Sequence, residues 1–97
     1  QGKENRGGAI EVIGSRDVTI SDCQVLDPRY RGIWLENATR CRVSNCTVVD
    51  RRAKKIMKAS IEVFGKSRDN IISGNIISRD SLPAADKAGL FRDNLEV

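Results

Sequence analysis

The sequence predicts an all-β solenoid, a fold in which short coils of strands stack on one another. Three segments of the chain align, residues 9–27, 32–50 and 60–79, the second starting 23 positions after the first and the third 28 after the second. Within each segment apolar and polar residues alternate over three or four positions, and Gly, Ser, Asp and Asn separate these stretches, as is typical of strands and turns. A unit this short cannot close a core alone, so we expect the units to stack.

Each unit is expected to contain three strands. The first strands are predicted at 10–13, 33–35 and 61–64, the second at 18–20, 41–43 and 70–72, and the third at 23–26, 46–49 and 75–78. β-Branched residues dominate them and suit a pleated, half-buried surface. Tight turns are expected at 21–22, 44–45 and 73–74. The residues that should face inward form five columns: Ile10/Ile33/Ile61, Val12/Leu35/Val63, Val18/Cys41/Asn70, Ile20/Val43/Ile72 and Val25/Val48/Ile77.

The stretches VTISDCQVLD, CRVSNCTVVD and NIISGNIISR resemble the coil signature of right-handed parallel β-helices of the pectin lyase-like superfamily. The resemblance implies about three coils over residues 9–80, a lead-in at 1–8, and a segment at 81–97 that caps the last coil or starts a fourth. The cap would be a short helical turn over 82–87, and the alternative is a fourth first strand at 89–91. The column Cys23, Cys46, Asn75 falls where the superfamily often stacks asparagines.

Composition excludes several classes of function. The 97 residues include no histidine, which excludes a His-based triad, a His general base and a His-ligated metal. No run approaches the ~20 apolar residues that cross a bilayer, so no membrane partner is expected. Three cysteines are too few for a disulfide-stapled mini-protein. Cys23 and Cys46 are expected to be free thiols, because aligned neighbours in parallel strands rarely have disulfide geometry.

The outward column of the first strands, Glu11, Trp34 and Glu62, is the first candidate binding site. In the resembled superfamily the binding groove runs along the outer face of the first sheet. An exposed indole ring can stack on a sugar, and carboxylates can accept hydrogen bonds from its hydroxyls or act as acid and base. A solvated face with one surface tryptophan is the alternative.

Two basic loops, residues 28–31 and 51–58, flank this column. Residues 29–58 carry nine Lys and Arg against two Asp and Glu, a net charge of +7, whereas the rest of the chain has eight against eleven, a net charge of −3. Such localised charge attracts polyanions, and the resemblance makes an acidic polysaccharide the expected one. Nucleic acid is not favoured, because no known binding motif is present. The candidate polysaccharide ligands are Arg29, Tyr30, Arg31, Arg51 and Arg52.

Asp27 and Asp50 occupy one column, where two stacked carboxylates need a cation between them. An arginine at 29, 51 or 52 could supply it, and so could Ca²⁺. Calcium needs six to eight oxygen ligands, which the sequence does not assemble. We therefore expect arginine pairing and no cofactor or metal. The stretch 50–57 could also form one helical turn capped by Asp50.

Together these features predict a segment of a secreted or cell-surface β-helix protein that binds or processes acidic polysaccharide. The resemblance extends to lyases, hydrolases and epimerases, of which a polysaccharide lyase is the expected activity if the parent protein is an enzyme. No diagnostic motif is present, and no catalytic residue is assigned. A non-catalytic scaffold for adhesion or assembly is the alternative. Self-association through uncapped coil ends is also expected, because few coils leave strand edges and apolar side chains open.

Overall fold

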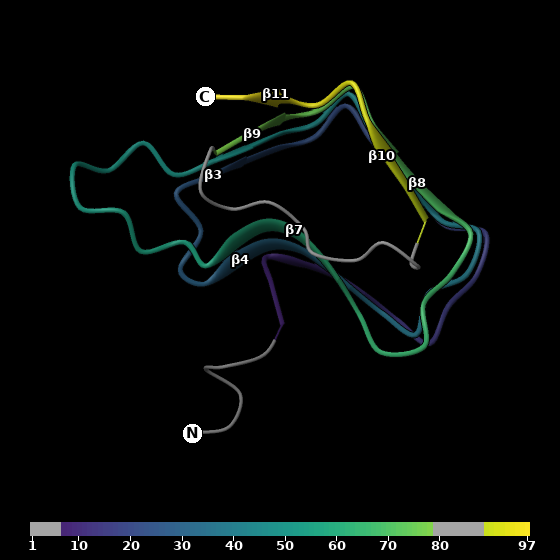
Figure 1. Ribbon diagram of the computed structural model, residues 1–97. Helices are drawn as coiled ribbons and strands as arrows, with labels where there is room; N and C mark the ends of the chain where they lie inside the picture. The colour runs from purple at the N-terminus through teal and green to yellow at the C-terminus, as the bar shows by residue number, and fades with distance from the viewer. Residues whose placement is uncertain (1–6, 79–88) are drawn as a thin grey trace.

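In the computed structural model, which describes residues 7–78 and 89–97, the chain winds through three parallel sheets that enclose one core (Figure 1). The first sheet contains β1 (Ile10–Ile13), β4 (Arg31–Glu36) and β7 (Ala59–Phe64). The second contains β2 (Thr19–Ser21), β5 (Arg42–Ser44), β8 (Asn70–Ser73) and β10 (Gly89–Arg92). The third contains β3 (Gln24–Leu26), β6 (Thr47–Val49), β9 (Ile76–Ile77) and β11 (Leu95–Glu96).

The predicted inward columns are confirmed by the strand register. Ile33 pairs with Ile10 and Ile61, and Val43 pairs with Ile20 and Ile72. The middle coil is sealed from solvent on both sides, so Ile33 and Val43 are fully buried. Burial of each such side chain contributes roughly 1.5–3 kcal/mol. The stacked columns are therefore the core of the fold. In the described residues there is no helix, and hence none that is long and apolar enough to cross a membrane.

The predicted tight turns between the second and third strands are also present. Asp22, Asn45, Gly74 and Asp93 have φ angles of 57°, 55°, 70° and 57° at equivalent places in successive coils. Few residues other than Gly, Asn and Asp adopt this left-handed conformation readily. The same sequence signal in each coil therefore produces the same sharp corner.

A ladder of side-chain hydrogen bonds follows each of these corners. Asn75 Nδ2 donates to Val43 O at 3.1 Å, and Asn94 Nδ2 donates to Ile72 O at 3.1 Å. In the coil before them, the thiol of Cys46 takes the same place, 3.3 Å from Ser44 O and 3.9 Å from Ile20 O. Each amide oxygen also accepts a main-chain N–H of the preceding coil, as Asn75 Oδ1 does from Cys46 N at 2.9 Å.

The cysteines are free thiols, as expected. Cys41 and Cys46 are buried and Cys23 is half-buried. Burial raises the pKa of the Cys46 thiol, so this side chain stays protonated and serves as a weak donor in the ladder.

Residues 89–97 extend the second and third sheets. Phe91 pairs with Ile72 and Leu95 pairs with Ile76. Of the two alternatives left open for this segment, a fourth strand of the first sheet at 89–91 is therefore wrong, because β10 belongs to the second sheet. The physical reason is that Asn94 takes the next place in the asparagine ladder, which sets the register of β10 and β11. The helical turn expected over 82–87 lies outside the described residues.

Candidate functional site

The outward column of the first sheet is in register, since Trp34 pairs with Glu11 on one side and Glu62 on the other. The expectation that Trp34 is an exposed stacking platform was wrong, because only 2% of the residue is exposed. The Phe64 ring stacks on its indole at a centroid distance of 5.3 Å and an interplanar angle of 29°. The Arg31 guanidinium lies over the same indole, 4.8 Å from its centroid.

Phe64 is the ring that this face presents to solvent, and the sequence interpretation missed it. It is 48% exposed and belongs to the next outward column, where Glu36 pairs with both Ile13 and Phe64. The alternation of side chains along a strand could have predicted its position. Residues two positions apart point to the same face, so 13, 36 and 64 point outward together with 11, 34 and 62. An exposed aromatic ring backed by a buried one is a rigid, flat apolar surface.

The three carboxylates of this face are held in fixed positions. Glu62 accepts a hydrogen bond from Arg31 Nε at 2.6 Å, and Glu36 accepts one from Trp34 Nε1 at 3.0 Å. Glu11 accepts one from Gly8 N at 3.1 Å. Each carboxylate has several lone-pair sites, so each can also accept from a ligand hydroxyl.

Four of the predicted ligands lie together at the start of β1 and β4. Glu11, Arg29, Tyr30 and Arg31, with residues 7–9, line a shallow hollow of about 300 Å³. The Arg29 guanidinium lies 5.9 Å from the centroid of the Tyr30 ring. The hollow thus combines an exposed cation, a phenol and a fixed carboxylate.

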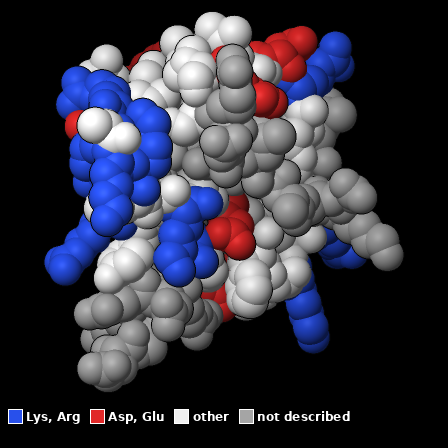
Figure 2. Space-filling view, turned by 60° about the vertical axis from the view of Figure 1, so that its left-hand side comes forward, with Lys and Arg blue, Asp and Glu red and all other residues white. Residues whose placement is uncertain are grey.

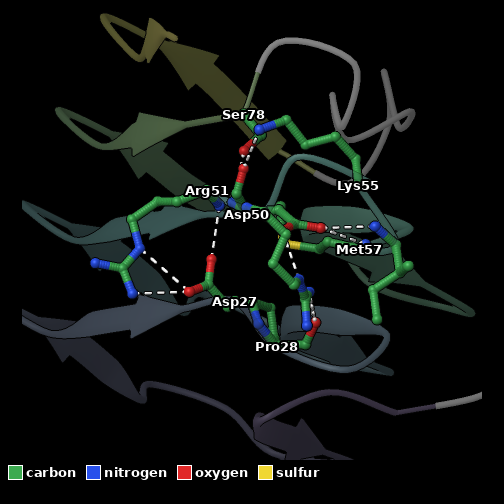
Figure 3. Close-up of polar contacts among 9 residues, drawn as sticks. Asp27, Pro28, Asp50, Arg51, Lys55, Met57 and Ser78 are labelled. Carbon is green, nitrogen blue, oxygen red and sulfur yellow. Dashed lines mark hydrogen bonds and ion pairs between the residues drawn. The ribbon is translucent and has the colours of Figure 1, made fainter.

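The loop that joins β6 to β7, residues 50–58, is organised around Asp50 (Figure 3). Asp50 Oδ2 accepts the main-chain N–H groups of Ile56 at 2.7 Å and Met57 at 2.8 Å. Asp50 Oδ1 accepts from Arg52 at both the main-chain N, at 3.1 Å, and Nε, at 2.7 Å. The loop contains no helical turn. A single buried carboxylate therefore satisfies four donors and fixes the path of the loop.

Arg51 and Arg52 are bound within the chain, unlike the open cationic rim that the sequence suggested. Arg51 forms an ion pair with Asp27 at 2.7 Å, and Arg52 forms one with Asp50 at 2.7 Å. Arg52 Nη2 also donates to Pro28 O at 2.6 Å. The expected arginine pairing of Asp27 and Asp50 is thus confirmed.

These contacts shift the pKa of both carboxyls. The Arg52 guanidinium, helped by the amides of Met57 and Ile56, holds the pKa of Asp50 well below its usual range. The Arg51 guanidinium and main-chain amide lower the pKa of Asp27. Both groups are therefore fixed as anions, which makes them poor proton donors.

The Lys and Arg side chains of this region that are free to attract an anionic ligand lie on the basic loop, residues 51–58, and beside the hollow. Four exposed side chains of this region are, among the described residues, not paired with a carboxylate: Arg29, Lys54, Lys55 and Lys58. Lys55 Nζ donates to the main-chain oxygen of Asp50 at 2.7 Å, so it keeps its positive charge. Lys and Arg gather on the side of the molecule from which the loop projects (Figure 2). Because Arg31, Arg51 and Arg52 are already neutralised by carboxylates, these four side chains carry most of the attraction of this region for an anion.

A family model described as a right-handed β-helix region matches residues 3–94 of the chain. The protein belongs to this right-handed β-helix family. A search of curated proteins and a search of solved structures each found no match. The family establishes the β-helix and the handedness of its coils, whereas the ligand has to be inferred from the site.

Asp50 should make the stability of the folded β-helix depend on pH. Its pKa is lowered by folding, so its contribution to stability is complete above the unfolded value of about 3.9 and is lost as pH falls through the folded value. We expect the thermal midpoint, followed by circular dichroism, to fall steeply below about pH 4. Asp50→Asn should flatten that fall, because the amide does not titrate.

The same variant should loosen the basic loop at neutral pH. The amide keeps one acceptor oxygen but places its own donors beside those of Ile56 and Arg52. Trypsin should cleave within 51–58 roughly tenfold faster in Asp50→Asn than in the wild type. Asp22→Asn, which removes a charge from an exposed turn, is the matched control. Equal cleavage rates in all three proteins would show that Asp50 does not hold the loop.

Proposed function

We propose that this segment of a β-helix binds an acidic polysaccharide across the outer face of its first sheet. The observation that carries the proposal is the half-exposed Phe64 ring stacked on the buried Trp34. A flat ring on a rigid sheet offers area for the apolar face of a sugar at little cost in conformational entropy. Glu36 and Glu62, held beside it, accept hydrogen bonds from sugar hydroxyls.

The preference for an anionic polymer comes from the basic loop and the hollow. Lys54 and Lys58 attract anionic groups at the edge of the first sheet, and Arg29 binds a carboxylate with its planar fork. Arg51 and Arg52 support this surface through their ion pairs with Asp27 and Asp50. The proposed site therefore has an aromatic part and a cationic part at opposite ends of the strands.

Titration with defined polymers tests this function. We expect polygalacturonate, alginate or a sulfated glycosaminoglycan to bind more tightly than neutral glucan, and to lose affinity between low and physiological salt. Phe64→Ala should weaken binding roughly fivefold, the equivalent of a ring contact worth ~1 kcal/mol, and leave the salt dependence unchanged. Lys54→Ala/Lys58→Ala should weaken binding and reduce the salt dependence.

The matched control is Arg16→Ala/Arg42→Ala. It also removes two positive charges, but from exposed residues away from the proposed site. Arg42 is in β5 of the second sheet, and Arg16 lies in the turn between β1 and β2. This control should bind like the wild type. If no anionic polymer binds more tightly than neutral glucan, the proposal is wrong and a scaffold role replaces it. Release of reducing ends or unsaturated uronates in the same mixtures would show that bound polymer is also processed.

A further inference from the structure

The exposed ring and the basic loop of the proposed site lie at the two ends of one strand. Lys58 directly precedes β7, and Phe64 is the last residue of that strand. The loop projects from the start of β7, and the chain turns toward the second sheet at the other end (Figure 1). The six steps from residue 58 to residue 64, at about 3.3 Å each, place the two about 20 Å apart along the strand. A single ligand that contacts both must therefore follow the strand.

The outward columns that cross the strands do not join the ring to a cation. Phe64 is followed across the sheet by Glu36 and Ile13. The neighbouring outward column contains Glu62, Trp34 and Glu11. Within the described coils, neither column contains a Lys or Arg residue. An anionic polymer laid across the strands over Phe64 would therefore meet the carboxylate of Glu36 and no cation of that column.

The path along β7 has a different distribution of charge. Of the residues between the ring and the loop, 59–63, only Glu62 has a charged side chain, and the other four residues are buried. Glu62 is paired with Arg31, whose Nε lies 2.6 Å from Glu62 Oε1. The charge along this path therefore changes from nearly neutral at Phe64 to positive at Lys58. This path suits an anionic ligand better than either outward column does.

We propose that the polysaccharide lies along β7, with the apolar face of one sugar on Phe64 and the anionic group of another at Lys58. This inference rests on the proposed function, because it concerns the direction and length of the ligand at the same site. The ligand that binds tightly is an acidic oligosaccharide long enough to span about 20 Å. A single acidic sugar reaches the ring or the basic loop but not both. A longer one gains from both, because the second contact forms within the bound complex.

A length series of oligogalacturonates, from the monomer upwards, tests the length of the site. In isothermal titration calorimetry at physiological salt, affinity should rise at least roughly tenfold at the first oligomer that spans about 20 Å. Phe64→Ala should leave the binding of shorter oligomers at the basic loop unchanged and weaken the binding of longer ones roughly fivefold. Lys54→Ala/Lys58→Ala should weaken both. Arg16→Ala/Arg42→Ala should again bind like the wild type.

Ile13→Lys tests the direction of the ligand. It adds a cation to the column of Phe64 at a residue that is already exposed. The new charge lies two strand spacings from β7, or about 10 Å, which exceeds the screening length of about 8 Å at physiological salt. A ligand that follows β7 should therefore bind this variant and the wild type equally. A ligand that crosses the strands should gain at least roughly threefold in affinity, and that gain would overturn the inference.

The outcomes separate this inference from the proposed function. If affinity does not depend on length, or if Phe64→Ala weakens the shortest and the longest oligomers alike, the ligand does not follow β7 and the proposed function still stands. If no acidic oligomer or polymer binds, both are wrong. Circular dichroism should show that all variants keep their β structure. If Phe64→Ala unfolds, the length series of the wild type and the binding of Ile13→Lys still decide the direction.

Discussion

Asn75→Ala should lower the free energy of unfolding by about 2–6 kcal/mol, because it leaves a buried N–H and a buried carbonyl without partners at roughly 1–3 kcal/mol each. The N–H is that of Cys46, which donates to Asn75 Oδ1, and the carbonyl is that of Val43, which accepts from Asn75 Nδ2. Asn75 is 1% exposed, so water cannot replace the amide without rearrangement. Denaturant unfolding followed by the fluorescence of the single tryptophan, Trp34, measures the change.

Two further variants in the same ladder set the scale of this effect. Asn94→Ala should cost less, because the residue is only partly buried at the end of the ladder. Cys46→Asn should stabilise the protein by about 1 kcal/mol, since an amide in this column can donate to Ile20 O better than the thiol does at 3.9 Å. Equal stability of Asn75→Ala and the wild type would mean that the ladder contributes no net free energy.

Gly32→Ala should destabilise the protein by at least about 1–3 kcal/mol, the usual cost of overpacking a core. A Cβ at this position would overlap Val48 Cγ1 and lie 2.5 Å from Ser60 O. Val48 is fully buried and Ser60 belongs to β7, so relief requires β4 and β7 to separate or the core to repack. The unfolding midpoint in denaturant should fall accordingly.

A double-mutant cycle identifies the cause of that loss. Val48→Ala removes the overlapping methyl groups, so Gly32→Ala should cost less in the Val48→Ala background than in the wild type. Relief should be partial, because the carbonyl of Ser60 stays in place. If the two substitutions are additive, the cost of Gly32→Ala comes from the main chain and not from contact with Val48.

Much of the fold follows from the sequence because stacking is local and repetitive. Ile10, Ile33 and Ile61 could be placed together from their spacing alone, since parallel strands in register bring equivalent residues into contact. Strand limits were less certain. β4 and β7 begin at Arg31 and Ala59, two residues before their predicted starts, because pairing extends strands into residues with no strand pattern of their own.

The candidate site depended on contacts between residues far apart in the chain. Sequence alternation placed Trp34 on the outer face correctly, but its exposure is decided by Phe64, thirty positions later, and by the side chain of Arg31. The charge pattern located the basic loop, but not which arginines in it are neutralised. Glu36 and Phe64 were missed because only one of the two outward columns was considered.

By itself the sequence determined the β-helix, its inward columns, its tight turns and the free cysteines, because each of these repeats with the coil and depends on residue type and spacing alone. Only the tertiary structure decided which ring faces solvent, which cations remain for a ligand, and which sheets residues 89–97 join. Those outcomes depend on where long side chains settle: Arg52 reaches back to Pro28, and Asn94 continues the ladder of Asn75. Long side chains are placed by the packing of neighbouring coils and not by the repeat. The corner at Asp93-Asn94 does repeat the signal of Gly74-Asn75, but its place in the ladder became evident only from the strand register.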